Sequence, residues 1–250
     1  MLLCAKRDIP VTVALCQLIL AGSFVKRGTG LRTALELYVG TGSWAAAMRR
    51  HNFDAVAHDI MLGPEFDVTK PATRARYMNE AQDVDVTHHG LECRTWSVAA
   101  NGKYRSRQFL KGYPRNHPRF TKKRSAIARN ANVMVDFTLD DFEARARAGR
   151  VCTIENPASS LFWKLRRTRK LLQLPNVQCV SICYCAYGTK YRKSTLLAVA
   201  NWDGAAALAS TCSCGANHVE VLMGSRTSKA AAYPERLTSK WTSLLSSHFR

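Results

Sequence analysis

The chain has 250 residues, 46% of them hydrophobic, and its 37 lysines and arginines outnumber its 18 aspartates and glutamates to give a net charge of +19. This length suits one α/β domain or two small ones, and the apolar content excludes general disorder. Such an excess of positive charge predicts a polyanionic partner, nucleic acid ahead of a membrane surface. The nine cysteines are an odd number, which favours a reducing, intracellular compartment over a disulfide scaffold.

The first thirty residues contain an apolar stretch. Residues 9–25 are mostly apolar, follow Lys6 and Arg7, and end near the small residues "AGS". The pattern is that of a signal-peptide core or of an N-terminal helix that packs on the domain. We favour the helix, because a secreted basic protein with this cysteine usage is an awkward combination.

The clearest local motif is a strand, a Gly-rich turn and a helix. Residues 34–39 have an apolar strand pattern, "GTGS" follows, and "WAAAMRRH" is helical. Glycines in such a turn let the backbone approach a ligand, with the N–H groups of the helix aimed at it. A second strand, "DAVAHDI", carries Asp59 about twenty residues on, where an acid can bind ribose hydroxyls. With Glu36 and Tyr38 before the glycines and no Walker lysine after them, the pattern favours an adenosine-type cofactor.

Helix and strand patterns alternate along the rest of the chain. The segment 101–124 is basic, has interleaved aromatic residues and lacks any helical or strand period. Cations and aromatics on a loop suit a phosphate backbone and stacked bases, while the alternative is a solvated loop. The other expected elements are helices over 71–82, 125–148, 159–172 and 235–247, and strands over 84–87, 150–157, 176–188 and 194–201.

Two of the expected strands lead into reactive groups. Cys93 lies in the loop after the strand 84–87, beside Arg94, and a nearby cation lowers the pKa of a thiol. Glu155 and Asn156 end the strand 150–157. Because open α/β sheets bind ligands beyond the carboxyl ends of their strands, we expect these groups to meet there. The alternatives are a buried structural cysteine and a capping or turn role for the carboxylate.

Three motifs, "LELYVGTGS", "GLECRTWS" and "IENPASSLFW", stand in this order along the chain. Together they resemble the cytosine-5 DNA methyltransferases, in the small, divergent form found in mobile-element and viral relatives, over residues 33 to about 200, with a weak further likeness in "AAAYPERL". The resemblance implies an α/β, Rossmann-like class I methyltransferase fold, with a mixed, mostly parallel seven-stranded sheet and helices on both faces. It divides the chain into an N-terminal extension or helix (1–30), a catalytic domain (31–205) and a C-terminal Cys/His segment with a closing helix (206–250).

The resemblance also implies roles for individual residues, with S-adenosylmethionine as cofactor. Residues expected to bind the cofactor are Tyr38, Gly40, Thr41, Gly42, Asp59 and Asp67. Residues expected to act on cytosine are the nucleophile Cys93, Glu155 with Asn156 at the base edge, and Lys193 in "AYGTKYRKST". Residues expected to contact nucleic acid are Arg94, Lys103, Arg105, Arg107 and Arg192.

The sequence departs from the family pattern in three respects. Glu92 replaces the proline before the cysteine, and Tyr191, Lys193 and Thr195 replace a glutamine and two arginines. Few residues separate this last motif from the C-terminal helix, so sequence specificity would come from a protein partner or be low. Two interpretations therefore stand: a methyltransferase acting on cytosine C5 in nucleic acid, or an inactive protein of the same fold that binds nucleic acid or serves in a larger assembly. DNA is favoured over RNA as the target, no membrane contact is expected, and a eukaryotic location would be nuclear.

The remaining cysteines form C-x-C pairs near a histidine. Thiolates and imidazole suit zinc, so a structural zinc ion is a further hypothesis. Its candidate ligands are Cys183, Cys185, Cys212, Cys214 and His218. Because C-x-C is tighter than the usual zinc spacing, the alternative is buried strand cysteines and a polar loop.

Overall fold

The computed structural model describes residues 30–215, 218, 220 and 230–250. They form a six-stranded sheet in the order β2-β1-β3-β4-β6-β5. Strands β1 to β4 are parallel, and β6 is antiparallel to both of its neighbours, β4 and β5. The strands are β1 (Thr33–Leu37), β2 (Asp54–His58), β3 (Val86–His89), β4 (Val151–Pro157), β5 (Val177–Cys183) and β6 (Ser194–Ala200).

A parallel sheet with one antiparallel strand inserted next to its last strand is the arrangement of the class I methyltransferase fold, as expected. The number of strands differs, because the described residues form six rather than seven. From β2 the chain passes through the 3-10 helix η1 (Pro64–Phe66) and the helix α3 (Pro71–Glu80) directly into β3, which pairs with β1. Within the part of the chain that the structure describes, β2 is therefore the outer strand of this edge.

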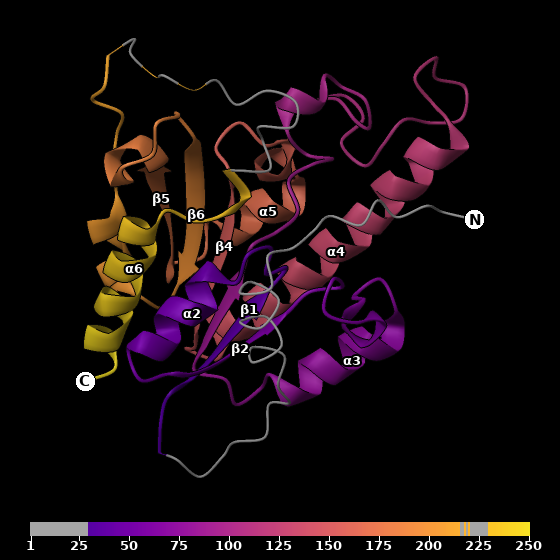
Figure 1. Ribbon diagram of the computed structural model, residues 1–250. Helices are drawn as coiled ribbons and strands as arrows, with labels where there is room; N and C mark the ends of the chain where they lie inside the picture. Colours follow the sequence, from indigo (N-terminus) through magenta and orange to yellow (C-terminus); the bar gives the residue numbers. More distant parts are fainter. Residues whose placement is uncertain (1–29, 216–217, 219, 221–229) are drawn as a thin grey trace.

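Helices cover both faces of the sheet (Figure 1). Helices α2 (Ser43–Arg50) and α6 (Glu235–His248) pack together on one face, and α3, α4 (Lys122–Arg147) and α5 (Arg166–Leu171) cover the other. Side chains alternate between the faces of a strand, so Ala34 packs with α2 and α6 while Leu35 packs with α3 and α4. The rings of Trp44 and Trp241, 6.1 Å apart, join α2 to α6.

Several boundaries differ from the sequence expectation for local reasons. Helix α4 begins at Lys122, because the hydroxyl of Thr121 accepts the N–H of Arg124 and caps the helix. The single helix expected over 159–172 is broken at Leu165, whose φ of −62° and ψ of 135° are extended, into the 3-10 helix η3 (Leu161–Lys164) and α5. Strand β5 ends at Cys183, and the 3-10 helix η4 (Tyr184–Tyr187) follows. The remaining 3-10 helices are η2 (Val98–Ala100) and η5 (Asp203–Leu208).

Two expectations concern membranes and the N-terminal segment. Among the described residues, no helix has both the length and the apolar character needed to cross a membrane. The helix expected over residues 9–25 lies outside the described residues.

Candidate active site

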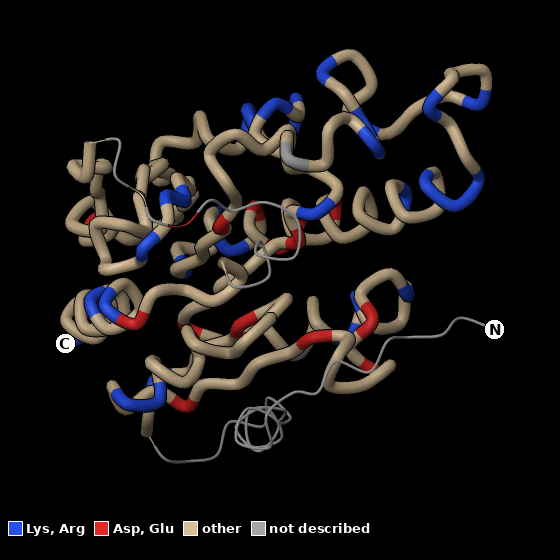
Figure 2. The backbone as a smooth tube through the Cα atoms, turned by 45° about the horizontal axis from the view of Figure 1, so that its top comes forward, with Lys and Arg blue, Asp and Glu red and all other residues tan. Residues whose placement is uncertain are grey.

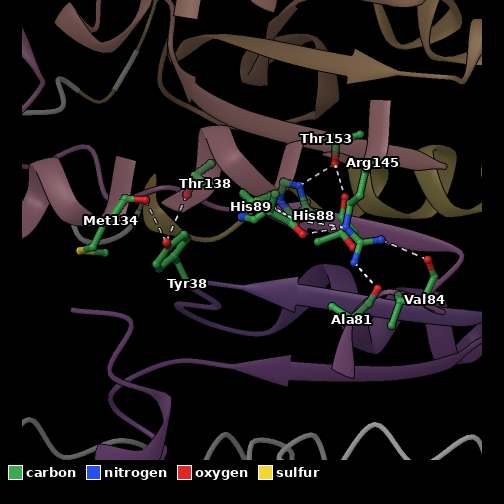
Figure 3. A network of polar contacts seen from close by, with 11 residues as sticks. Tyr38, Ala81, Val84, His88, His89, Met134, Thr138, Arg145 and Thr153 are labelled. Atoms are coloured by element: carbon green, nitrogen blue, oxygen red, sulfur yellow. Dashed lines mark hydrogen bonds and ion pairs between the residues drawn. The ribbon is translucent and has the colours of Figure 1, made fainter. Parts of the chain in front are cut away.

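The Gly-rich turn between β1 and α2 is built on left-handed backbone. The φ angles of Tyr38, Gly40 and Gly42 are 61°, 55° and 70°. Glycine adopts this region without strain, whereas tyrosine does not. The phenol of Tyr38 donates to the carbonyl of Met134 (3.2 Å) and accepts from the hydroxyl of Thr138 (3.1 Å), so α4 holds its side chain in place (Figure 3).

The end of β2 is joined to this turn by Asp59. Its Oδ1 accepts the N–H of Met61 (2.9 Å) and its Oδ2 the N–H of Gly40 (3.4 Å). Beside it, Ile60 and Met61 are 57% and 70% exposed, which gives the carboxylate an apolar flank. The buried hydroxyl of Ser43, at the start of α2, has no hydrogen-bond partner among the described residues. A carboxylate, an apolar surface and a free polar atom beside a helix N-terminus fit a nucleoside-bearing ligand.

The other two expected cofactor residues lie in turns. Thr41 is exposed in the turn between Gly40 and Gly42. Asp67 precedes α3, and its Oδ1 accepts the N–H (3.0 Å) and the hydroxyl (2.7 Å) of Thr69. The observed contacts of Asp67 are those of a local turn. Contact with a cofactor therefore stays a prediction for Asp67 and for Thr41.

Glu36 positions the start of α2. The carboxyl group is buried in the middle of β1, and its Oε2 accepts the N–H of Ala45 (2.8 Å). Burial raises the pKa of Glu36 to about 8, with the hydrogen bond from Ala45 opposing this shift and the charge of Asp59 adding to it. The group is therefore a mostly protonated, structural part of the glycine turn at neutral pH.

The loop after β3 presents Cys93 at the carboxyl end of the sheet. Gly90 leaves the strand where a Cβ would lie 3.1 Å from both the hydroxyl of Tyr233 and the carbonyl of Tyr38. The carbonyl of Cys93 accepts the N–H groups of Trp96 (3.0 Å) and Ser97 (2.7 Å), which closes a tight turn. The thiol is partly accessible.

Arg105 stabilises this loop from inside the protein. Its side chain is 1% exposed and stacks on Trp96, with Cζ 3.4 Å from the ring centroid. Its guanidinium donates to the carbonyl and the hydroxyl of Thr95 (both 3.0 Å), to the carbonyl of Leu110 (2.7 Å) and to Oδ1 of Asn132 (2.9 Å). The expectation that Arg105 contacts nucleic acid is therefore wrong, because its donors are used within the fold.

Glu155 and Asn156 lie where β4 runs past the end of β3. The register pairs His89 with Ile154, so both side chains come just beyond the last pair, on opposite faces of the sheet. Asn156 is buried and its Nδ2 donates to the carbonyl of Leu91 (2.9 Å), which ties β4 to the cysteine loop. Its buried Oδ1 has no partner among the described residues.

The turn that leads into β6 contributes the cation of this site. The Nζ of Lys193 lies 3.5 Å from Oε1 of Glu155, donates to the phenol of Tyr184 (3.2 Å) and sits 4.4 Å from the centroid of that ring. The hydroxyl of Thr195 donates to the same carboxylate oxygen. The side chains of Cys93, Glu155 and Lys193 are therefore close enough to interact electrostatically.

The electrostatics of the region act against a thiolate. Burial raises the pKa of the Cys93 thiol; the Lys193 ammonium lowers it, and the carboxylates of Glu155 and Glu92 raise it. Glu92 is partly buried, and its Oε1 lies 3.3 Å from Nε of Arg94. Burial raises the pKa of Glu92, and the charge of Arg94 opposes this shift. The net result is a thiol that stays protonated at neutral pH in the free protein.

A buried network of hydrogen bonds next to Glu155 is not predicted by local patterns in the sequence. The hydroxyl of Tyr233 donates to Oε2 of Glu155 (3.5 Å) and lies 2.8 Å from Nε2 of His88, whose Nδ1 lies 2.9 Å from the hydroxyl of Thr153. Burial lowers the pKa of His88 well below its usual range, so the imidazole is neutral. In the sequence, only the two adjacent histidines at the end of β3 and the tyrosine of "AAAYPERL" point to this network of hydrogen bonds.

The adjacent histidine has a different partner on the other face of the sheet. Nε2 of His89 lies 2.9 Å from Asp141 on α4, and Arg145 pairs with the same carboxylate at 3.0 Å (Figure 3). Arg145 also donates to the carbonyl of Val84 (3.1 Å). Cys152 lies close to His89 and Asp141, but the carboxylate is neutralised by arginine, so this cluster joins α4 to the sheet rather than forming a metal site.

The cations that remain available for nucleic acid lie on loops at the same end of the sheet. The side chain of Arg94 is 71% exposed, and Lys103, Arg107 and Arg192 are also exposed. Figure 2 shows lysines and arginines gathered along the loop between β3 and α4 and at the start of α4. Contact with nucleic acid stays a prediction for these four residues.

Four of the five candidate zinc ligands form one group. The ligand atoms of Cys185, Cys212, Cys214 and His218 all lie within 4.8 Å of one another. Cys183 stands next to this group, with its Sγ 3.2 Å from that of Cys185.

Known proteins offer only a distant likeness. No family model matches the sequence, and no curated protein matches it. Solved structures similar to this chain include the Entamoeba histolytica methyltransferase EhMeth (13% identity, 68% of this chain and 53% of that one, TM-score 0.35), a variant of Spodoptera frugiperda DNMT2 (15%, 69% and 52%, 0.36) and the S. pombe Dnmt2 methyltransferase (15%, 74% and 58%, 0.40).

This chain therefore spans a little over half the length of those structures. Because the identities and TM-scores are low, the fold is assigned from the strand order of this chain and the site from its own contacts.

Proposed function

We propose that this protein is an S-adenosylmethionine-dependent methyltransferase that acts on cytosine C5 in nucleic acid through a covalent adduct to Cys93. The observation that carries this proposal is the meeting of a thiol, a carboxyl group and an ammonium beyond the ends of β3 and β4. Cys93 and Glu155 are far apart in sequence, and Asn156 joins their two loops through its bond to Leu91. A cysteine with only a structural role would not need a carboxyl group and an ammonium beside it.

The chemistry of cytosine explains why these groups would be needed together. C5 of cytosine is not nucleophilic until a thiolate adds to C6, which forms a bond from the Cys93 sulfur to the ring. Negative charge then builds on N3, where the Glu155 carboxyl would stabilise it, and C5 becomes enamine-like and able to take a methyl group. Because a base inside a duplex is out of reach, the target must be flipped out or single-stranded.

The glycine turn supports the choice of cofactor. S-adenosylmethionine supplies an electrophilic methyl group when it is bound. Asp59 would bind the ribose hydroxyls, the exposed side chains of Ile60 and Met61 would flank the adenine, and the turn at Gly40 leaves open space for close approach. Asp67 and Thr41 are further candidates at the edge of this surface.

Nucleic acid is the proposed substrate, with DNA favoured over RNA. The segment 101–124 contains nine lysines and arginines and no acidic residue, and it leads directly from the Cys93 loop into α4. Such a charge distribution suits the phosphate backbone. Target recognition would come from a protein partner, since the residues between β6 and α6 include no segment of recognition-domain size.

A second candidate function is favoured by the raised pKa of Cys93. With Glu92 beside the thiol, the protein would keep the fold and the basic surface but bind nucleic acid without methylating it. The two functions make opposite predictions about cofactor binding and adduct formation.

The deciding experiment has two parts. Calorimetry should detect micromolar binding of S-adenosylmethionine that Asp59→Ala weakens at least tenfold. With an oligonucleotide containing 5-fluorocytosine, which blocks release of the enzyme, a denaturation-resistant adduct should form only when the cofactor is present. Cys93→Ala should abolish this adduct, while Cys179→Ala, a change at an exposed cysteine on β5, should leave it intact.

The outcomes separate the two candidates. Absence of cofactor binding would refute the methyltransferase proposal and leave the binding protein. Binding without adduct in the wild type, but with adduct in Glu92→Gln, would mean that the thiol is chemically competent but held protonated by its neighbour. Methyl transfer that persists in Cys93→Ala would exclude the cytosine C5 mechanism.

A further inference from the structure

A second set of reactive side chains lies outside the candidate active site. Cys185 belongs to η4, while Cys212, Cys214 and His218 lie on the chain after η5. Three thiols and one imidazole thus come from two separate segments, and their ligand atoms lie within 4.8 Å of one another. Burial of apolar sulfur does not explain the group, because Cys212 is only half-buried and Cys214 is exposed.

The separations are close to those around one tetrahedral ion. Zinc binds thiolate sulfur at about 2.3 Å and imidazole nitrogen at about 2.0–2.1 Å, so tetrahedral ligand atoms are about 3.5–3.8 Å apart. The Sγ of Cys212 lies 3.3 Å from Nε2 of His218, and every other pair falls within the 4.8 Å limit. Small rotations of the side chains would bring all four atoms into this range.

The backbone holds the two segments together without the ion. The hydroxyl of Ser210 accepts the N–H of Cys183 (3.0 Å), and the N–H of Ser210 donates to the carbonyl of Ser181 (3.0 Å). The phenol of Tyr187 donates to the carbonyl of Leu208 (2.8 Å). The ligands are therefore prepositioned along the end of β5.

We propose that Cys185, Cys212, Cys214 and His218 bind one structural zinc ion. Four protein ligands fill the coordination sphere, which leaves no open position for a substrate. Cys183, whose sulfur lies 3.2 Å from that of Cys185, is not a fifth ligand but a neighbour that can donate a weak hydrogen bond to the bound thiolate.

The ion would fasten the segment after η5 to the turn between β5 and β6. Just beyond His218, the N–H of Glu220 donates to the carbonyl of Lys190 (3.2 Å), and Tyr191 pairs with Glu220 in a parallel bridge. The same turn carries Lys193, whose Nζ donates to the carbonyl of Ala230 (3.0 Å). Zinc would thereby fix the turn that delivers the ammonium to Glu155. Only this last consequence rests on the proposed methyltransferase function; the metal site does not.

The test is the metal content of the full chain, purified under reducing conditions and dialysed against metal-free buffer. The wild type should retain about one zinc per chain, and Cys212→Ser and Cys185→Ser should each lose most of it. Cys179→Ser is the matched control, since Cys179 is an exposed cysteine on β5 outside the group, and it should retain the metal. His218→Cys should also retain it, because a fourth thiolate suits zinc.

A cobalt spectrum of the wild type tests the metal site even if a variant folds poorly. Cobalt added to the metal-free wild type should give the visible bands of a tetrahedral thiolate site, and zinc should displace them. A wild type that holds no zinc and gives only an octahedral cobalt spectrum would overturn the proposal. Equal loss of zinc in Cys179→Ser and Cys212→Ser would do the same, since the metal would then not depend on the group.

Discussion

At the scale of single residues, the polar side chains inside this sheet set its response to pH. Glu36 and His88 lie on the α2 and α6 face, one in β1 and the other in β3, and both are buried. Burial favours the neutral form of each: it raises the pKa of the acid and lowers that of the imidazole. The two groups therefore affect stability with opposite signs as the pH changes.

The contribution of Glu36 can be isolated by Glu36→Gln. Its pKa rises from 4.5 in the unfolded chain to about 8 in the fold, so between these values the folded state keeps a proton that the unfolded state has lost. The free energy of unfolding of the wild type should thus fall with rising pH, relative to that of Glu36→Gln, by up to about 1.4 kcal/mol per pH unit. Urea unfolding across this pH window measures the difference. Parallel pH dependences would contradict the prediction, and the exposed Glu65→Gln serves as control.

Some residues of the candidate site can be predicted from the sequence and others cannot. The two groups differ in how far along the chain their contacting residues lie. Gly40, Gly42 and Cys93 stand in short motifs that can be read from neighbouring residues. Tyr233 reaches His88 and Glu155 from the other end of the chain, a contact that no local pattern encodes. Arg105 was assigned to nucleic acid because its neighbours are basic, whereas the stack on Trp96 that buries it depends on the path of the loop.

At the scale of elements, the loop from Leu91 to Ser97 is held from two sides. Asn156 at the end of β4 binds the carbonyl of Leu91, and Arg105 binds Thr95 through two of its nitrogens. A loop that carries a nucleophile must keep a fixed geometry, and these contacts come from the sheet and from the chain leading to α4. Loss of either contact should make the loop that carries Cys93 more mobile, while the thiol itself is kept.

Arg105→Lys tests this support. Lysine keeps the charge but has a single nitrogen, so it cannot serve Thr95, Leu110 and Asn132 at once. We expect a loss of about 2–4 kcal/mol in the free energy of unfolding, since buried carbonyls are left without partners. Amide hydrogen exchange in residues 91–97 should also become faster. Arg107→Lys, a change at an exposed position, should alter neither, and an unchanged exchange rate in Arg105→Lys would disprove the supporting role.

The existence of most elements followed from the sequence, while their ends depended on tertiary contacts. The expected strand 84–87 ends before two polar histidines, yet β3 continues through His88 and His89, each of which bonds to a buried side chain through a ring nitrogen. The helix expected over 159–172 breaks where Leu165 turns its side chain into the α4 and α5 core. Periodicity identifies apolar faces, but it does not reveal which polar groups the fold will satisfy.

At the scale of the whole molecule, positive charge is concentrated on one group of loops. The segment 101–124 and the exposed side chains of Arg94 and Arg192 belong to loops that follow β3 and join β5 to β6. Since Cys93 and Lys193 lie on the same loops, the proposed nucleic acid would pass close to the candidate site.

The salt dependence of nucleic-acid binding tests this arrangement. The logarithm of the binding constant should fall linearly with the logarithm of salt concentration, by about 0.9 per neutralised phosphate of a duplex. Replacing Lys103 and Arg107 together by alanine should make this slope shallower by about two units. Lys240→Ala, at an exposed position on α6, should leave the slope unchanged. A slope near zero in the wild type would mean that the basic loops do not contact phosphates.

The position of β6 also has a consequence for how the protein is made. Among the described residues β6 is the last strand in sequence, yet it lies between β4 and β5 in the sheet. During synthesis β4 therefore has an unpaired edge of mostly buried residues until residues 194–200 have left the ribosome. An open edge of this kind is a template for association with other chains. The growing chain is thus most prone to aggregate after β4 is complete, and arrival of the β5–β6 hairpin ends that period by covering the edge.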